Sequence, residues 1–370
     1  MMKQAIVNLA KRSYMQLISK QRPQINDTIA YLLSFPENNR QLLTELIAEF
    51  PQLRIYYTKN CQAEALDYAR LGAMIQPLEP FAKLLKNIPV IAGARLLLAD
   101  NYFAFLGALD LAQTPVIQLW HANGAIKSFG LEAKYAQQAT PADRLRYQEV
   151  YQRFSHYVVA SETMGRAFQR SYLAKPAQIK LLGTPRTDRY FDESWRRDVK
   201  QRVRDVFGDQ PIALYAPTYR ETATSMPDTA WLQTKDYRML VKAHPHDHDL
   251  RRQVPEQMLD LAGFSLMELL PSVDLLISDY SSVPFEYALA NSTGKMLFYC
   301  YDLEEYQAKV GIQPDFEKWA PGPIFKELTT KELLVPQQDF HQFNAMWNTM
   351  NDGQAIPRVI QEIKELYHGD

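Results

Sequence analysis

Short apolar, β-rich runs alternate with longer helical patterns along most of this chain, and this alternation is the strongest constraint on its fold. Six runs in the first half are expected to form buried strands: residues 27–35, 53–58, 94–100, 115–121, 156–162 and 178–185. Four runs repeat the arrangement in the second half: residues 211–220, 237–245, 273–279 and 294–302. Intervening segments such as 40–50 and 143–154 space their apolar residues as helices do. Two such series predict two α/β domains, each with a parallel sheet wound on both faces.

The boundary between these domains is expected near residues 181–211, where a strand ends in a Gly/Pro turn and a highly charged helical stretch follows. A length of 370 residues suits two domains of ordinary size. We therefore expect four parts along the chain: a basic helix at 1–22, an N-terminal domain at 23–188, a C-terminal domain at 189–340 and a C-terminal helical segment at 341–370. The last helix of that segment should cover about 354–367.

Composition narrows the class of protein. Hydrophobic residues make up 46% and charged residues 22% of the chain, as in ordinary soluble globular proteins. The formal net charge of -1 gives no argument for a nucleic-acid partner.

Cys61 and Cys300 are the only cysteines, so neither a disulfide scaffold nor a cysteine-rich zinc site is expected, and a reducing cytosol is the simpler compartment. No apolar stretch is long enough to cross a bilayer without charged interruptions.

The first 22 residues are basic, since no acidic side chain occurs before Asp27. If they form a helix, their apolar residues fall in one broad stripe. Such a basic amphipathic helix could lie on an anionic membrane surface. It could equally be a solvated helix that packs on the first domain, and the residues by themselves leave both alternatives open.

Polar residues follow several of the predicted strands at the point where each strand ends. In open parallel sheets, ligands bind outside the carboxyl ends of the strands. Seven polar residues of this chain share that position: His121, Thr218, Arg220, His244, Asp279, Ser281 and Ser282. Their shared position predicts ligand binding at the carboxyl edges of the sheets.

The stretch "SDYSSVPFEYA" (278–288) places two serines at a strand-to-helix turn. A helix that begins near Ser282 leaves main-chain N–H groups unpaired, and with the helix dipole these can bind an anion that the hydroxyls help to hold. The alternative is an ordinary N-cap formed by Ser281 or Ser282. Glu286 lies one turn later, where it can accept hydrogen bonds from ribose hydroxyls or remain a solvated glutamate.

The stretch "KAHPH" contains His244 and His246, but further zinc ligands are missing at a recognisable spacing. His244 is better interpreted as a hydrogen-bond donor to an anionic ligand. Arg220 can present a planar fork to phosphate oxygens. The alternative for Arg220 is a surface salt bridge with Glu221.

His121 ends a strand of the predicted first domain and is followed by a turn that contains Asn123 and Gly124. Histidine titrates near neutral pH. Across a cleft from a bound phosphate, His121 is therefore a candidate general base that takes the proton of an acceptor hydroxyl as it attacks phosphorus.

Seven short motifs occur in the order found in the CDP-glycerol glycerophosphotransferases of teichoic acid synthesis. They are "WHANGAIKSFG" (120–130), "LLGTPRTDRYF" (181–191), "YAPTYRE" (215–221), "VKAHP" (241–245), "SDYSSVPFEYA" (278–288), "FYCYDLEEY" (298–306) and "PGPI" (321–324). From about residue 94 to residue 324 the chain resembles this family. The resemblance implies a GT-B-like fold, in which two doubly wound Rossmann-like domains face a central cleft that holds the active site.

The resemblance also implies a reaction, the transfer of a polyol phosphate from a CDP-polyol to an acceptor hydroxyl with release of CMP. His121 resembles the family's base. Binding of the donor phosphates and nucleotide carries over to Thr218, Arg220, His244, Asp279, Ser281, Ser282 and Glu286. On the acceptor side we expect Asn123, Gly124 and Lys127. No metal cage is visible in the sequence, so we expect neither an obligatory metal nor a cofactor.

This chain departs from the family pattern at two places. The family often has Gly-Thr-Pro where this chain has residues 122–124, and a bulky aromatic residue and Asp where this chain has Pro284 and Glu286. These departures concern the choice of acceptor and polyol more than the type of reaction.

The family's acceptor is lipid-linked, which would give the basic helix at 1–22 a function. We expect a peripheral protein on the cytoplasmic face of the membrane of a Gram-positive bacterium, with CDP-glycerol as donor and an undecaprenyl-pyrophosphate disaccharide as acceptor. A compact chain without a large additional domain resembles a primase, which adds the first glycerol phosphate in wall teichoic acid synthesis. Nucleic acid is not an expected partner, and the sequence leaves a homo-oligomer open.

Three alternatives remain at this point. The donor could be CDP-ribitol instead of CDP-glycerol. The chain could be another GT-B transferase of the CMP-sialic-acid type, which can also carry a His-Pro motif and paired serines. It could also be a nucleotide-sugar-binding or membrane-scaffold protein that has lost turnover.

Overall fold

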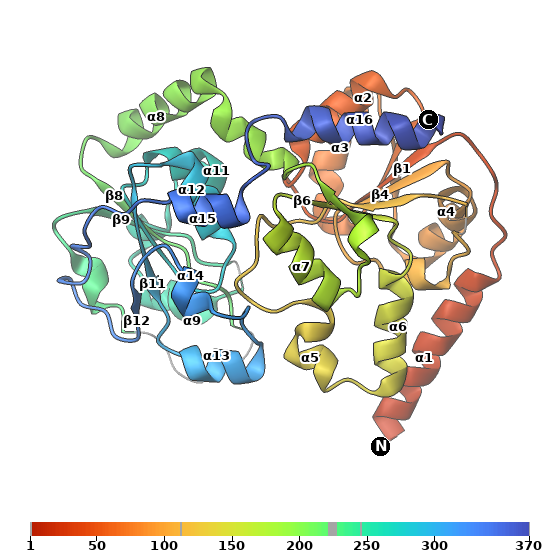
Figure 1. Cartoon of the computed structure of the whole chain (residues 1–370), viewed down its shortest axis with the longest axis horizontal. Coiled ribbons are helices and arrows are strands. Elements are labelled where there is room, and N and C mark those ends of the chain that lie inside the picture. The colour runs from red at the N-terminus through yellow and green to blue at the C-terminus, as the bar shows by residue number, and fades with distance from the viewer. Residues whose placement is uncertain (1, 112, 221–227, 245, 370) are drawn as a thin grey trace. The chain divides into compact units, whose positions relative to one another are not determined.

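The computed structural model describes residues 2–111, 113–220, 228–244 and 246–369. The chain forms two compact units (Figure 1). The first unit comprises Met1–His121, Ala136–Arg186 and Gln354–Asp370, and the second comprises Ala122–Tyr135 and Thr187–Gly353. Each unit is built on its own parallel sheet, as the alternation of strands and helices predicts.

The sheet of the first unit has seven strands in the order β3-β2-β1-β4-β5-β6-β7. The strands are β1 (Ile29–Leu33), β2 (Leu53–Tyr57), β3 (Met74–Pro77), β4 (Leu96–Ala99), β5 (Val116–Gln118), β6 (His156–Val159) and β7 (Ile179–Leu181). All neighbouring strands run parallel. The strand order reverses between β1 and β4, and Rossmann folds bind ligands outside the carboxyl ends of the strands at such a reversal.

Helices cover both faces of this sheet. They are α1 (Met2–Ser19), α2 (Arg40–Glu49), α3 (Gln62–Arg70), α4 (Phe81–Ala92), α6 (Pro141–Tyr151), α7 (Glu162–Ser171) and α16 (Ala355–His368). Figure 1 shows α2 and α16 on one side of the sheet and α1, α4 and α6 on the other. Leu46 of α2 and Val359 of α16 belong to the same buried cluster as Leu98 of β4. A sheet buried on both faces explains why its central strands are apolar throughout.

The sheet of the second unit has five parallel strands in the order β12-β11-β10-β8-β9. The strands are β8 (Ile212–Tyr215), β9 (Arg238–Val241), β10 (Leu275–Ser278), β11 (Lys295–Tyr299) and β12 (Ile324–Phe325). The helices are α8 (Glu193–Phe207), α9 (His248–Gln253), α10 (Glu256–Leu259), α11 (Leu266–Leu269), α12 (Val283–Ala290), α13 (Leu303–Lys309), α14 (Phe316–Trp319) and α15 (His341–Trp347). Here the strand order reverses between β8 and β10, so the carboxyl ends of these strands are the expected ligand position.

All ten predicted strands are present, and the predicted last helix is confirmed as α16. The sequence pattern did not predict β3 and β12. β3 lies at the edge of its sheet and has no fully buried residue, while β12 has only two residues. Neither strand therefore carries the apolar run by which buried strands are recognised.

The division of the chain differs from the expected boundaries in two places. Residues 122–135 belong to the second unit although they were expected in the N-terminal domain. The segment expected at 341–370 is divided, because residues from 354 onward return to the first unit. The passage near the middle of the chain lies between Arg186 and Thr187, close to the predicted end of the first domain at 188. A short helix, α5 (Lys134–Gln137), contains the passage from the second unit back to the first.

The last two turns of α1 pack on the first unit. Ile18 is fully buried, and the ring of Tyr14 lies 5.0 Å from the ring of Phe81 on α4. Lys11 Nζ forms an ion pair at 2.9 Å with Asp143 on α6. For these residues the structure shows the packed helix that the sequence offered as the alternative to membrane binding.

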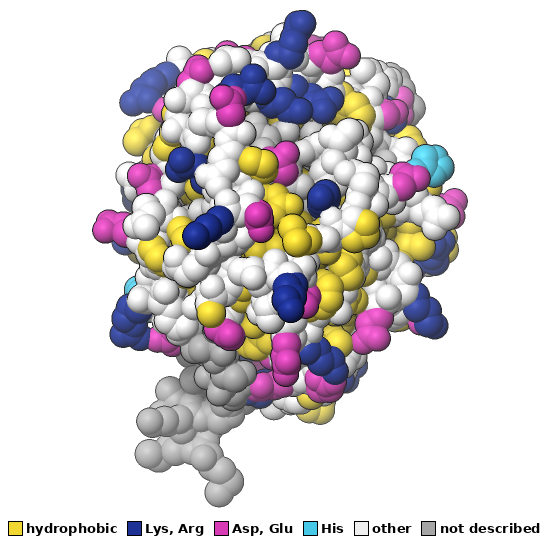
Figure 2. Space-filling view, turned by 90° about the vertical axis from the view of Figure 1, so that its left-hand side faces the viewer, with side chains coloured by type: hydrophobic (Ala, Val, Ile, Leu, Met, Phe, Trp, Pro, Cys, Tyr) yellow, Lys and Arg dark blue, Asp and Glu magenta, His cyan; other side chains and the backbone are white. Residues whose placement is uncertain are grey.

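Figure 2 shows basic and acidic side chains interspersed over the face that it draws, with hydrophobic side chains between them. This mixture agrees with the formal net charge of -1. Among the described residues, no helix is both long and apolar enough to cross a membrane.

Candidate active site

The carboxyl ends of β8, β9 and β10 carry three of the predicted residues. Thr218 follows β8, His244 follows β9, and Asp279 comes directly after β10. Because these strands are parallel neighbours, the three residues lie along one edge of the second sheet. Their predicted position at strand ends is confirmed. Asp302 occupies the corresponding position after β11.

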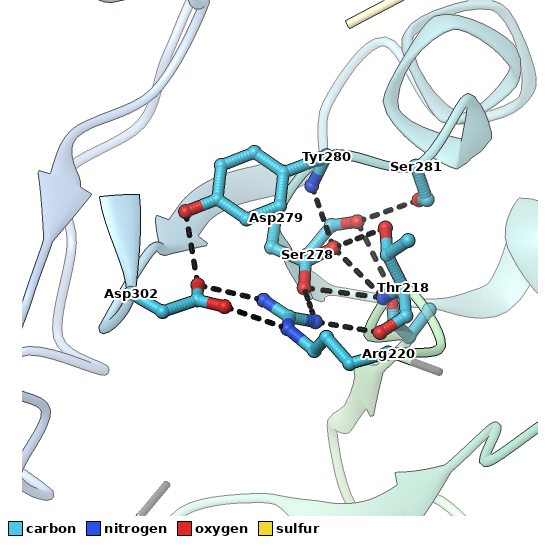
Figure 3. Close-up of polar contacts among 8 residues, drawn as sticks. Thr218, Arg220, Ser278, Asp279, Tyr280, Ser281 and Asp302 are labelled. Carbon is cyan, nitrogen blue, oxygen red and sulfur yellow. Dashed lines mark hydrogen bonds and ion pairs between the residues drawn. The ribbon is translucent and has the colours of Figure 1, made fainter. Parts of the chain in front are cut away.

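Arg220 lies between two carboxylates at this edge (Figure 3). Its Nε and Nη2 donate to the two carboxylate oxygens of Asp302, both at 2.9 Å. Its Nη1 donates to Asp279 Oδ2 at 2.6 Å and to the carbonyl oxygen of Thr218 at 2.5 Å. The planar fork that was predicted to bind phosphate is therefore engaged by Asp302. The alternative partner Glu221 lies outside the described residues.

Three tyrosine rings surround the same guanidinium group. The Cζ atom of Arg220 lies 4.9 Å from the ring centre of Tyr301, 5.4 Å from that of Tyr280 and 5.5 Å from that of Tyr306. Burial disfavours the charge of Arg220, but Asp279 and Asp302 outweigh it and raise the pKa of the guanidinium. Arg220 thus remains charged and ties together the turns that follow β8, β10 and β11.

Asp279 is fully buried and accepts hydrogen bonds from both sides of the strand reversal. Its carboxylate accepts from Thr218 N at 2.9 Å, from Thr218 Oγ1 at 2.7 Å and from Tyr280 N at 2.6 Å, in addition to Arg220. Four donors on one carboxylate leave little capacity for a ligand. The carboxylate therefore fixes the turns after β8 and β10 against each other.

The serine pair divides into two different environments. The Oγ of Ser281 accepts from Val283 N at 3.3 Å and lies 2.9 Å from the Oγ of Ser278. Ser282 is the N-cap residue of α12, and within the described structure its side chain makes no capping hydrogen bond. Pro284 lacks an N–H group, so the start of α12 offers fewer main-chain donors to an anion than a typical helix.

Glu286 is buried and accepts a hydrogen bond from the Tyr190 hydroxyl at 2.9 Å. The alternative of a solvated glutamate does not hold, because the carboxylate is buried and binds the hydroxyl of a buried tyrosine. Its proposed contact with ribose stays a prediction.

His244 is exposed, and its ring stacks on Tyr219 with a centroid distance of 4.7 Å and an interplanar angle of 17°. Its Nδ1 lies 3.3 Å from His246 N. A main-chain N–H group can only donate, so Nδ1 accepts and the neutral ring carries its proton on Nε2. This tautomer is the one required of a hydrogen-bond donor to an anion.

The main-chain partner of His121, in the first unit, favours the opposite neutral tautomer. It follows β5, and its Nδ1 lies 3.2 Å from the main-chain oxygen of Asp100. A carbonyl oxygen can only accept, so Nδ1 carries the proton and the basic lone pair is on Nε2. The ring of Phe35 stacks on the imidazole with a centroid distance of 4.0 Å and an interplanar angle of 7°.

The residues expected on the acceptor side belong to the second unit. Asn123 is fully buried and is hydrogen-bonded to Asn348 at 2.9 Å and to Asn351 at 3.0 Å. Gly124 has φ +70, and a Cβ atom there would lie 2.4 Å from the ring of Phe285. These two residues therefore anchor residues 122–135 on the second unit, which corrects their predicted placement in the N-terminal domain. Lys127 is exposed, and its main chain forms a β-bridge with Ile312.

Sequence reasoning did not identify Asp302 and Asp100 as members of these sites. Both residues follow strands that the sequence pattern predicted, so the rule that identified Asp279 also applies to them. The three tyrosines around Arg220 gave no such signal, because a tyrosine ring in an apolar segment is usually part of the core.

A family model described as CDP-Glycerol:Poly(glycerophosphate) glycerophosphotransferase matches residues 14–365. The chain belongs to this family. It is an enzyme, and the glycerophosphotransferase resemblance inferred from the seven motifs is confirmed.

Curated relatives match nearly the whole chain. The teichoic acid glycerol-phosphate primase of Bacillus subtilis (strain 168) is 32% identical over 358 residues, which cover 91% of this chain and 92% of the primase. The teichoic acid ribitol-phosphate primase of Bacillus spizizenii (strain ATCC 23059 / NRRL B-14472 / W23) is 29% identical over 349 residues, which cover 87% of this chain and 86% of that protein. These matches place the glycerophosphotransferase in teichoic acid synthesis as a CDP-polyol phosphotransferase.

The fold is also that of a solved enzyme. The structure of the wall teichoic acid polymerase TagF matches with a TM-score of 0.73 at 18% identity, and the match covers 99% of this chain and 95% of that chain. The predicted α/β, GT-B-like fold class is therefore confirmed.

Proposed function

We propose that this glycerophosphotransferase transfers one glycerol phosphate from CDP-glycerol to a hydroxyl group of an undecaprenyl-pyrophosphate-linked disaccharide, with release of CMP. The observation that carries the proposal is that two histidines at strand ends meet opposite main-chain groups at Nδ1. A carbonyl oxygen lies 3.2 Å from Nδ1 of His121, and the N–H group of His246 lies 3.3 Å from Nδ1 of His244. As neutral rings, His121 would then carry its basic nitrogen at Nε2 and His244 its proton there. Acceptor activation needs the first kind of imidazole and charge stabilisation needs the second.

The reaction is an in-line displacement at the phosphorus that carries glycerol. The acceptor oxygen forms a bond to this phosphorus, and the bond from phosphorus to the bridging oxygen of CMP breaks. The acceptor proton passes to Nε2 of His121, and the electron pair of the broken bond leaves with CMP. Correct placement of the attacking oxygen and stabilisation of the phosphoryl charge together supply most of the rate enhancement in such a step.

The donor side of the proposal rests on the second unit. His244 donates to the diphosphate from its Nε2–H group, and the hydroxyl of Ser282 and the first N–H groups of α12 complete the cradle. Arg220 and Asp279 act through the turns that they hold, since their polar atoms already bind each other and Asp302 or Thr218. This is a positioning role in place of the phosphate contact expected from the sequence.

The choice of a glycerol-phosphate primase rests on the relatives. The Bacillus subtilis glycerol-phosphate primase and this chain cover each other over nine tenths of their lengths. The ribitol-phosphate primase matches at 29% identity, so CDP-ribitol is the second candidate donor.

A CMP-release assay with a lipid-linked disaccharide acceptor tests the proposal. CDP-glycerol, CDP-ribitol and CMP-sialic acid are supplied in turn, and the mass of the lipid product is measured by mass spectrometry. We expect CMP release from CDP-glycerol and a product heavier by a single glycerol phosphate. A ladder of products indicates a polymerase, whereas release only from CDP-ribitol or CMP-sialic acid refutes the proposed donor. Binding of CDP-glycerol without any CMP release indicates a protein that has lost turnover.

We also propose that the reaction needs no obligatory metal ion, because the donors assigned to the diphosphate (His244, Ser282 and the first N–H groups of α12) are all groups of the protein. Turnover in the presence of a chelator should remain within about twofold of the rate without it. A loss of activity that added Mg²⁺ restores contradicts this proposal.

Membrane association is proposed to involve exposed basic side chains of α1 and of the turn that follows it. Arg12 on α1 and Lys20 directly after α1 are exposed, whereas Lys11 is paired with Asp143. Replacing Arg12 and Lys20 by Glu should weaken binding to anionic vesicles without disturbing the packing of α1, since each basic residue near an anionic surface contributes about 1 kcal/mol. Lys318→Glu, at an exposed position of the second unit, is the control. Unchanged vesicle binding of the double variant refutes the membrane role of α1.

A further inference from the structure

The loop between β1 and α2 is held by a buried carboxylate. Asp100 directly follows β4, which pairs with β1, and it is fully buried. Its Oδ2 accepts from Ser34 N at 2.8 Å and from Phe35 N at 2.9 Å, and its Oδ1 accepts from Ser34 Oγ at 2.8 Å. One carboxylate therefore fixes the first two residues of the loop.

The same loop forms one wall around His121. The ring of Phe35 is parallel to the imidazole at 4.0 Å, and the indole of Trp120 lies 4.2 Å from it at an angle of 33°. The main-chain oxygen of Asp100 lies 3.2 Å from Nδ1 of His121. Asp100 is therefore connected to the imidazole in two ways. Its carboxylate holds the loop that carries the stacked ring of Phe35, and its main-chain carbonyl group faces Nδ1 of His121.

A second anchor of the loop supports this geometry. Asn38 Nδ2 donates to the main-chain oxygen of Trp120 at 2.9 Å. Trp120 has φ 63, a left-handed conformation that is costly for a bulky residue. Non-glycine residues persist in this conformation where the surrounding structure holds them, and they concentrate at functional sites. The β1–α2 loop therefore holds the residue before His121 as well as the ring that stacks on it.

Core packing does not account for this arrangement. Phe35 is 38% exposed although it has a large apolar side chain. Burial raises the pKa of the Asp100 carboxyl to about 6, despite the donors from Ser34 and Phe35. Among the described groups, Glu64 raises the pKa of this carboxyl further, and the carboxyl in turn raises the pKa values of Cys61 and Tyr31. None of these three groups is a cation. A partly exposed ring and a buried carboxylate are both unfavourable for stability, which suggests a functional reason for keeping them.

We propose that Asp100 is a positioning residue for His121, which orients the imidazole and selects its Nδ1–H tautomer through Phe35 and the main-chain carbonyl group. The inference rests on the proposed function, in which Nε2 of His121 takes the acceptor proton. Asp100 itself does not contact the substrate in this proposal.

Substitutions of Asp100 and Phe35 test the proposal with the full-length enzyme. Asp100→Asn places an amide where three donors converge, and it should lower kcat by about tenfold to hundredfold while KM for CDP-glycerol changes by less than about twofold. Phe35→Leu should lower kcat by about tenfold because the stacked ring is lost, whereas Phe35→Tyr keeps the ring and should stay near the wild-type rate. Glu362→Gln removes another largely buried carboxylate of the first unit, on α16, where it pairs with Lys180, and it should leave kcat unchanged.

The state of the imidazole gives a readout that does not depend on turnover. Nitrogen NMR of the enzyme with ¹⁵N-labelled histidine should show an Nδ1-protonated neutral His121 in the wild type, assigned with His121→Gln. Asp100→Asn and Phe35→Leu should shift this signal toward a mixture of tautomers. If the wild type shows the tautomer but no donor releases CMP, the proposed function fails and the positioning role survives.

Two results overturn the positioning role. One is a wild-type tautomer and wild-type kcat in both Asp100→Asn and Phe35→Leu. The other is an effect on KM for CDP-glycerol alone. If Asp100→Asn does not fold, the comparison of Phe35→Leu with Phe35→Tyr decides the question, since equal kcat values for these two variants refute it.

Discussion

The Nδ1 atoms of His121 and His244 meet opposite main-chain groups, which favour opposite tautomers of the neutral ring. A carbonyl oxygen faces Nδ1 of His121 and an N–H group faces Nδ1 of His244. Any histidine can accept a proton as a base or donate a hydrogen bond, and the main-chain group at Nδ1 favours one of these two functions. Sequence reasoning assigned a base and a donor to these positions, but the tautomers depend on the folded main chain.

Alanine variants of the two histidines should have different kinetic effects. His121→Ala should lower kcat by about 10²–10⁴ while the Kd for CDP-glycerol stays near the wild-type value, since the imidazole acts on the acceptor. His244→Ala should raise that Kd about tenfold or more, because a hydrogen bond to a charged ligand contributes roughly 1.5–3 kcal/mol. Calorimetric titration and steady-state kinetics measure the two effects. A wild-type rate in His121→Ala removes this residue from the mechanism.

Arg220 is the residue whose environment differs most from the sequence expectation. Its fork binds Asp302, which lies 82 residues later in the chain. A buried cation between two carboxylates is costly to remove, because the remaining charges stay buried without a partner.

Arg220→Ala should therefore destabilise the second unit by about 3–5 kcal/mol. Urea unfolding followed by tryptophan fluorescence measures the loss. Arg252→Ala is the matched control, since Arg252 forms an exposed ion pair with Asp249 and its loss should cost less than about 1 kcal/mol. If both variants are equally stable, the Arg220 cluster does not brace this unit.

At the scale of elements, α1 shows how one pattern fits two environments. Its basic and apolar residues suit a membrane surface, yet Lys11, Tyr14 and Ile18 contact the first unit. An amphipathic helix has one apolar stripe, and that stripe by itself does not indicate whether protein or lipid covers it.

The ion pair between Lys11 and Asp143 should make the packing of α1 depend on pH. Lys11, with Thr140 and Arg146, lowers the pKa of the Asp143 carboxyl to about 2. A lowered pKa means that the stabilisation is present above about pH 4 and is lost as the pH falls toward 2. The difference in unfolding free energy between the wild type and Lys11→Ala should therefore be about 0.5–1 kcal/mol at pH 7 and shrink below pH 4.

Denaturant titrations at pH 7, 5, 4 and 3 follow this difference. Arg12→Ala, which removes an exposed neighbouring cation, should show no comparable dependence on pH. A difference that stays constant down to pH 3 contradicts the assigned pair.

At the scale of the whole molecule, the chain passes between the two units more than once. Residues 122–135 pack in the second unit through Asn123 and Gly124, and α16 returns to the first unit at the end of the chain. Ile356, Val359 and Ile363 of α16 are buried in the same cluster as the strands of the first sheet. The last segment of the sequence therefore completes the core that the first segment begins.

Ile363→Ala should destabilise the first unit by about 2–5 kcal/mol, because it leaves a cavity in that core. Hydrogen exchange should then rise in β1, β4 and α2 and stay unchanged in β8–β11. Gln361→Ala, at an exposed position of the same helix, should leave exchange in both units unchanged. Increased exchange in the second unit instead would contradict the assignment of α16 to the first unit.

The sequence by itself determined the ten main strands, the parallel α/β class, the family and the strand-end positions of His121, Thr218, His244 and Asp279. These features depend on apolar periodicity and turn residues, which act within a few positions along the chain. Only the tertiary structure decided that Arg220 binds Asp302, that Glu286 faces Tyr190, and that Asn123 anchors its segment on the second unit. These outcomes depend on which distant strand ends become neighbours and on which polar atoms must find partners once water is excluded.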